Sequence, residues 1–118
     1  MANVYKNIQA PIDQAGSDVD MYTSPEATSS IIKTVKLYNT HGSNLVVIIK
    51  VYDATTATDF EWDRVTVNTT ASVDLLTFNN NIILEAGDIL KMQTPTTNVI
   101  KMTASVLQIS RPTEVTTT

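Results

Sequence analysis

The sequence has no cysteine and very little glycine or histidine. Its 118 residues include 3 glycines and 1 histidine. The absence of cysteine excludes disulfides, thiolate zinc sites and a cysteine nucleophile. A glycine-rich phosphate loop is excluded as well, because it needs several glycines close together before a Lys and a Ser or Thr. The fold must therefore be held by packing, with association between chains as a further source of stability.

The chain also lacks an excess of basic charge and any long apolar run. Charged residues make up 17% of the sequence, the net charge is −4 and the pI is about 4.7. Binding to nucleic acid or to anionic membrane without sequence preference needs a basic surface. The longest apolar run, Leu45–Ile49, is far too short to cross a membrane, and the first residues show no signal-peptide core. We expect a protein made in the cytoplasm that binds neither nucleic acid nor membrane.

The residues that are abundant favour strands. Hydrophobic residues make up 42% of the chain, which is enough for one core, and the length fits a single domain. Threonine accounts for about one residue in six, and Val and Ile are frequent. Such β-branched side chains suit a pleated surface better than a helix. The composition therefore predicts an all-β domain.

Alternation of apolar residues with a period of two recurs along the chain, and no long window has the helical period. Between positions 43 and 53 the odd positions form one apolar face, made of Leu45, Val47, Ile49 and Val51. Between positions 98 and 108 the even positions do the same, with Ile100, Met102, Ala104 and Val106. Farther upstream, Ile31, Val35 and Leu37 share a side that Lys33 interrupts.

Turn signals separate these runs at intervals of about 8–12 residues, which is typical of a sandwich or jelly roll. We predict an antiparallel β-sandwich or jelly-roll-like single domain over residues 18–110. Residues 1–17 are predicted to be an N-terminal arm or a first strand, and residues 111–118 a flexible tail. The predicted strands are Val4–Ala10, Asp18–Thr23, Ser30–Asn39, Leu45–Asp53, Asp59–Val67, Ala71–Phe78, Asn81–Leu84, Ile89–Gln93 and Val99–Ser110.

The stretch Glu85–Asp88 contains a glycine between acids, but it lacks the alternating oxygen ligands of a calcium loop. We interpret it as a tight reversal in which Gly87 takes a positive φ and Asp88 accepts hydrogen bonds from nearby backbone N–H groups. Pro25 and Gly42 are the other residues predicted to form turns.

Two candidates for chemistry remain, and each has a structural explanation. His41 lies in a polar turn without a recognisable nucleophile or orienting partner, so we interpret it as a loop residue. Asp59, Glu61 and Asp63 alternate and would share one face of a strand, where they could bind a cation. We favour a solvated face, with Phe60 and Trp62 buried on the other side. We therefore predict no catalytic residue, metal or cofactor. Asn68-Thr69-Thr70 matches a glycosylation acceptor by chance.

Several apolar residues lie on strand faces that one core does not obviously cover. Scattered exposed hydrophobic residues are normal, but a contiguous patch indicates contact with another subunit. The chain is small and these strands carry few charges, so we favour contact between subunits. The candidate interface residues are Ile32, Tyr38, Val46, Ile48 and Tyr52.

The order of motifs resembles a known group of proteins. The motifs are YTSP at 22–25, IIKTVKLYNT at 31–40, HGSN at 41–44, LEAGDILK at 84–91 and ASVLQIS at 104–110. Together they resemble small virion structural proteins of tailed bacteriophages, of the marine and cyanobacterial type, over about residues 18–110. Gln108 departs from the pattern, which has an acid there, and Glu26-Ala27 stands where many relatives have Ala-Gly.

The resemblance implies a non-enzymatic virion part with a β-sandwich or jelly-roll fold. Our first expectation is a capsid decoration (cement) protein on the outer capsid surface, a homo-oligomer, with a trimer favoured, that binds the major capsid protein. The alternatives are a tail, neck or fibre-associated component, or a carbohydrate- or receptor-binding module in which Trp62, Tyr38 and Tyr52 stack on sugars. An enzyme is disfavoured because no nucleophile–base pair is visible.

Overall fold

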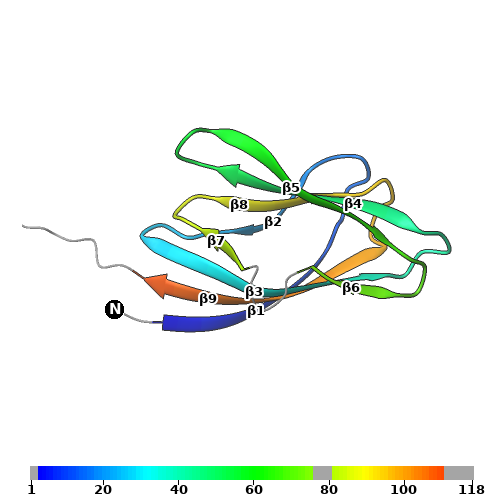
Figure 1. Cartoon of the computed structure of the whole chain (residues 1–118), viewed down its shortest axis with the longest axis horizontal. Helices are drawn as coiled ribbons and strands as arrows, with labels where there is room; N and C mark the ends of the chain where they lie inside the picture. The colour runs from blue at the N-terminus through cyan, green and yellow to red at the C-terminus, as the bar shows by residue number, and fades with distance from the viewer. Residues whose placement is uncertain (1–2, 76–80, 111–118) are drawn as a thin grey trace, which may run out of the picture.

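The computed structural model describes residues 3–75 and 81–110, and within these ranges the chain forms nine strands and no helix (Figure 1). The strands are β1 (Asn3–Pro11), β2 (Val19–Thr23), β3 (Thr28–Asn39), β4 (Leu45–Asp53), β5 (Thr58–Val67), β6 (Ser72–Asp74), β7 (Ile82–Leu84), β8 (Ile89–Gln93) and β9 (Ile100–Ser110). The predicted all-β class is confirmed. The predicted strand Ala71–Phe78 is wrong in length, and its part beyond Leu75, like the tail 111–118, lies outside the described residues.

Two antiparallel sheets pack face to face, which confirms the predicted β-sandwich (Figure 1). The five-stranded sheet has the order β1-β9-β3-β6, with β7 also paired to β3. The four-stranded sheet has the order β2-β8-β4-β5. The chain passes from one sheet to the other at most of its turns, so strands close in sequence face each other across the core. Residues 3–11 are paired with β9 over their whole length.

The core fills the space between the two inner faces. The alternating residues of β4 and β9 point inward as the period predicts, and Val47, Ile49 and Ile100 are fully buried. Burying each such side chain contributes about 1.5–3 kcal/mol, and no disulfide adds to it because the chain has no cysteine. Packing of these alternating faces is what holds the two sheets together.

A β-bulge in β3 changes which residues of that strand face the core. The register of β3 against β9 shifts between Ile32 and Thr34, so Lys33 is an extra residue in the strand. A bulge moves the residues after it to the opposite face. Ile32 therefore points inward together with Val35, and both are buried. The prediction that Ile31 shares a face with Val35 is wrong, and so is the placement of Ile32 on an exposed face.

A second bulge lies in β5. Its register against β4 shifts between Ile49 and Lys50, which leaves Trp62 as the extra residue. The prediction that β5 buries Phe60 and Trp62 is wrong, because their exposed fractions are 54% and 38%. The physical reason is that β5 is an edge strand, which in the described part of the chain is bonded only to β4. Side chains on such a strand have a neighbouring strand on one side only.

A buried polar cluster ties the two sheets together near the start of β3. The Gln108 side-chain amide donates to the Tyr22 hydroxyl at 2.6 Å, and that hydroxyl lies 2.7 Å from the Ser30 hydroxyl. Ser24 then bonds to Ser30 at 2.9 Å. Each buried oxygen and nitrogen in the cluster has a partner, which avoids the cost of an unsatisfied polar group. A neutral amide at position 108 suits this site because a buried carboxylate would need a compensating cation.

Candidate interaction surfaces

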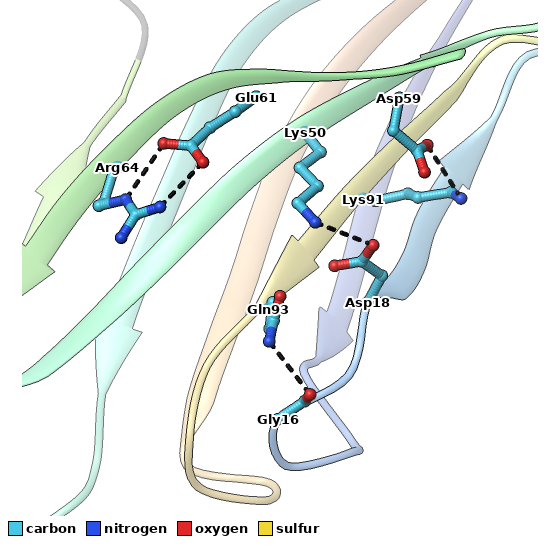
Figure 2. A network of polar contacts seen from close by, with 8 residues as sticks. All are labelled: Gly16, Asp18, Lys50, Asp59, Glu61, Arg64, Lys91 and Gln93. Carbon is cyan, nitrogen blue, oxygen red and sulfur yellow. Dashed lines mark hydrogen bonds and ion pairs between the residues drawn. The ribbon is translucent and has the colours of Figure 1, made fainter.

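The outer face of the four-stranded sheet carries a network of ion pairs (Figure 2). Lys50 Nζ lies 3.2 Å from Asp18 Oδ2, and Lys91 Nζ lies 3.2 Å from Asp59 Oδ1. The Lys91 ammonium also lies 4.9 Å from the centroid of the Tyr52 ring, which is within range of a cation–π contact. These side chains come from the neighbouring strands β4, β5 and β8 and from the residues before β2. The charges on this face are thus largely satisfied within the chain.

Arg64 and Glu61 form a third ion pair, with both partners on β5 (Figure 2). The guanidinium donates to the two carboxylate oxygens at 2.9 and 3.1 Å, a bidentate arrangement. These hydrogen bonds and the charge of Arg64 lower the pKa of the Glu61 carboxyl below its ordinary value. The same hydrogen bonds raise the pKa of Arg64. Both groups are solvent-exposed, so their energetic contribution is screened by water and salt.

The bulge at Trp62 also separates the three carboxylates of β5. Glu61 and Asp59 lie opposite Lys50 and Tyr52 on the outer face, whereas Asp63 lies opposite the inward-pointing Ile49. The cation site considered from the sequence requires all three on one face. Over residues 3–75 and 81–110, no group of three or more His, Cys, Asp or Glu could hold a metal ion.

A shallow hollow of about 310 Å³ lies beside the network on the same face. Val46 and Ile48 contribute its apolar lining, and Arg64 contributes a guanidinium. Gln93 donates its side-chain amide to the Gly16 carbonyl at 3.1 Å (Figure 2), and Thr94 donates to the Val46 carbonyl at 3.2 Å. Most of the polar groups here already have partners, and no nucleophile–base pair faces the hollow.

The outer face of the five-stranded sheet is different, because an apolar row crosses it. Tyr5 is the direct partner of Leu107, Leu107 that of Ile31, and Ile31 that of Ile83. Partners in a ladder lie side by side on one face, so the row spans β1, β9, β3 and β7. Tyr5 is 74% exposed and Ile83 is 65% exposed, the two highest values among the exposed large hydrophobic residues. We call these four residues the apolar row.

Lysines dominate the charge of this second sheet. Its strands carry four lysines and one aspartate, a formal charge of +3, whereas those of the four-stranded sheet carry three basic and five acidic residues, a charge of −2. In the part of the chain that the structure describes, none of the four lysines forms a salt bridge. They are Lys6, Lys33, Lys36 and Lys101.

The five residues predicted as a subunit interface do not form one patch. Val46, Ile48 and Tyr52 alternate along the outer face of β4, opposite Thr66, Arg64 and Asp59 of β5. Tyr38 lies on the outer face of the other sheet, opposite Lys101, and is 41% exposed. Ile32 is fully buried in the core. Sequence reasoning missed the apolar row, because its members come from four strands and are adjacent only through the strand pairing.

The Gly87–Asp88 turn has a structural role. Gly87 has a φ of 87°, and a Cβ at this position would lie 3.2 Å from the Ala54 Cβ. Asp88 is 8% exposed, and its carboxylate accepts hydrogen bonds from the backbone N–H groups of Glu85 and Ala54, both at 3.0 Å. The second of these bonds fastens the turn after β7 to the turn after β4. The carboxylate is therefore occupied by backbone donors.

The loop after β3 contains His41 and Gly42, and its polar groups bond to each other. The Asn39 side chain accepts from the His41 N–H at 2.7 Å and donates to the carbonyls of Ser43 and Val67, both at 2.9 Å. The His41 Nδ1 accepts from the Ser43 N–H at 3.1 Å. The turn at Pro25 contains Ala27 with a φ of 54°, a region that glycine occupies more readily. These contacts shape turns and leave no reactive group aligned.

No protein-family model and no curated protein matches this sequence. Within the described residues, no helix is long and apolar enough to span a membrane. A similar solved structure comes from work titled "Bacillus endospore appendages form a novel family of disulfide-linked pili". The two chains superpose with a TM-score of 0.54 at 9% identity, over 92% of this chain and 88% of the other. At this identity the likeness shows the sandwich fold that the two proteins share.

Proposed function

We propose that the protein is a non-enzymatic structural subunit of a bacteriophage virion, a capsid decoration protein that binds the outer capsid surface. The observation that carries the proposal is the apolar row, which leaves hydrophobic area exposed on one face of a small sandwich. Exposed apolar surface rimmed by polar residues is typical of a protein-binding site. The four lysines of the same sheet form no salt bridge within the described residues, so they are available to acidic groups on the particle.

Two further points support an assembly role. The motif order over residues 18–110 resembles virion structural proteins, and the solved structure with a similar fold is described as a pilus-forming appendage protein. That appendage is described as disulfide-linked, and the present chain has no cysteine. Any assembly that this protein forms is therefore not linked by its own disulfides. Location on a tail, neck or fibre is the alternative within the same class.

The first experiment is to measure binding of the purified protein to virions stripped of small surface proteins, by co-sedimentation and immunogold labelling. The variant Ile83→Ser, Leu107→Ser removes two members of the apolar row, and Val46→Ser, Ile48→Ser is its matched control on the other sheet. We expect the first variant to lose binding at least tenfold and the control to bind like the parent. Equal binding by both variants would reject the apolar row as the particle contact. Labelling of tails alone would select the alternative location.

A carbohydrate-binding module is the second candidate, because Trp62 and Phe60 are exposed on β5. Exposed aromatic rings can stack on sugars. A glycan array probed with the protein and with Trp62→Ala tests this function. Glycan binding that is lost in the variant, together with no binding to virions, would favour the module over the structural subunit.

A further inference from the structure

The outer edge of β1 is an unpaired strand edge of unusual regularity. Among residues 3–75 and 81–110, β1 pairs with β9 alone, through nine consecutive residue pairs without a register shift. The ladders β2–β8, β3–β9 and β4–β5 each contain a shift. A long straight edge exposes a row of backbone N–H and C=O groups and is a template for another strand.

The backbone groups at this edge can be assigned from the residue directly after β1. The Ile12 N–H donates to the Ile100 carbonyl, and the Ile12 carbonyl accepts from the Asn98 N–H, both at 2.9 Å. Ile12 therefore faces the β9 side of the sheet. In an antiparallel ladder the bonding direction alternates from residue to residue. The odd residues of β1 thus direct their backbone groups to the free edge, and Pro11, which has no N–H, is among them.

The features that protect other sheet edges are nearly absent from β1. Proteins guard long edges with charges, bulges and short strands. β5, the long edge of the other sheet, carries four charged residues and the bulge at Trp62. β1 has no bulge, its protective residues are one charge, Lys6, and Pro11 at its last position, and it leaves Tyr5 and Val4 exposed by 74% and 41%. Of the two long edges, β1 is the one built to accept a strand.

We propose that β1 pairs with β1 of a second copy of this chain, antiparallel and about a twofold axis at Asn7. Asn7 then lies opposite Asn7 of the second copy, Tyr5 opposite Gln9, and Lys6 opposite Ile8. The contact joins the five-stranded sheets of two copies into one continuous sheet. It is isologous, so it closes at two copies.

The register follows from the ladder and from the charges. An axis at Asn7 pairs all nine residues of β1, whereas an axis at Tyr5 leaves the end of the strand beyond Asn7 without a described partner. An axis at Lys6 places two ammonium groups directly opposite each other, which is destabilising. Residues on the inner side of the sheet stay opposite inner residues in the proposed register, so neither face is disturbed.

A second copy is the occupant because the edge is self-complementary. A pairing of β1 with β5 of another copy would oppose Lys6 to the acids of β5, but the bulge interrupts that edge. Asp59 and Glu61 are also already engaged by Lys91 and Arg64. Such a head-to-tail contact would form an open series of oligomers of increasing mass. A closed ring of three copies would have the mass of a trimer. The molar mass of the assembly therefore distinguishes both arrangements from the dimer.

The first test is the molar mass of the full chain by light scattering over a wide concentration range. An edge contact is small and falls in the transient class of interfaces below about 1,200 Å², so the dimer should appear as concentration rises. We expect the mass to rise from 12.9 kDa toward that of two copies. Asn7→Pro removes an outward N–H while β9 loses no bond, and it should weaken dimerisation at least tenfold. An unchanged thermal midpoint shows that the variant is folded.

The second test uses the absence of native cysteine. Asn7→Cys places two thiols opposite each other across the axis, within the Cα separation of about 4.4–6.8 Å that a disulfide needs. Gln9→Cys is the matched control, because its two copies would lie roughly 13 Å apart along the strands. We expect oxidation to give a covalent dimer for Asn7→Cys and much less for Gln9→Cys.

A mass that stays at one copy, a trimer, an open series of oligomers, or equal crosslinking by both cysteine variants would overturn the inference. So would a dimer that Asn7→Pro leaves intact. The inference rests on the proposed function only in its assumption that the protein works in an assembly. A dimer that fails to bind virions would support the β1 contact and reject the virion role. A monomer that binds virions would reject the β1 contact and support the virion role.

Discussion

The two outer faces of the sandwich treat charge in opposite ways. On the four-stranded sheet, Lys50, Lys91 and Arg64 each have a carboxylate partner within the chain. On the five-stranded sheet, none of the four lysines has such a partner among the described residues, and the apolar row crosses the outer face. Charged groups that are already paired within the chain are less available for ionic contacts with another molecule. We infer that the five-stranded sheet is the side that associates, and four sets of substitutions and titrations test this difference.

The largest expected effect separates the two faces of β3. Ile32→Ala removes a fully buried side chain and should cost about 2–5 kcal/mol in the free energy of unfolding. Ile31→Ala removes a member of the apolar row and should cost less than about 1 kcal/mol, because Ile31 is only partly buried and its partner Ile83 is exposed. Urea unfolding of both variants measures the two values. Similar losses would mean that the outer row is needed for folding and is not a free binding surface.

The next largest effect concerns Asp88, which precedes β8 of the four-stranded sheet and accepts hydrogen bonds from backbone N–H groups. Asp88→Ala leaves the N–H groups of Glu85 and Ala54 without their acceptor and should cost about 1–3 kcal/mol. Asp53→Ala is the control, since its carboxylate accepts from the exposed Thr55 N–H, which water can satisfy. We expect a change of at most about 0.5 kcal/mol there. Thermal unfolding checks both, and an equal loss would contradict the structural role of Asp88.

Smaller effects should distinguish the lysines of the two sheets. Lys50→Met breaks the contact with Asp18 and should reduce stability by up to about 1 kcal/mol, less in high salt. Lys101→Met, on the five-stranded sheet, should leave stability within about 0.5 kcal/mol at any salt concentration. Unfolding curves at low and high salt give both numbers. A salt-dependent loss in Lys101→Met would show that this lysine has an ionic partner after all.

The smallest effect is the titration of Glu61. Its pKa is lowered from the ordinary value of 4.5, first by the hydrogen bonds from Arg64. The contribution of this pair to stability is therefore present above the unfolded-state pKa and is lost as the pH falls through the lowered folded-state value. Carboxyl NMR titration should show a higher Glu61 pKa in Arg64→Gln than in the parent. The same pKa in both proteins would mean that the ion pair does not persist in solution.

Sequence reasoning succeeded where a single strand carries its own pattern. The alternation in β4 and β9 gave their buried faces correctly, and most strand ends were placed within two residues. It failed at the bulges, because one extra residue reverses the facing of the rest of the strand. Ile32 was therefore placed on a surface, and Trp62, the extra residue of β5, in a core. Phe60 stays opposite Val51 and is exposed because β5 lies at the edge of its sheet. The residue types at positions 33 and 62 do not predict a bulge, because a bulge depends on the register between two paired strands.

The sequence by itself determined the chemistry that is excluded and the class of fold. Without cysteine there is no disulfide, and frequent β-branched residues in alternating runs can bury their apolar side only in packed sheets. The tertiary structure alone decided which residues are neighbours on a surface. Tyr5, Ile31, Ile83 and Leu107 are far apart in sequence and meet only because β1, β9, β3 and β7 pair in one register. Strand pairing is nonlocal, so the apolar row exists only in the folded sheet.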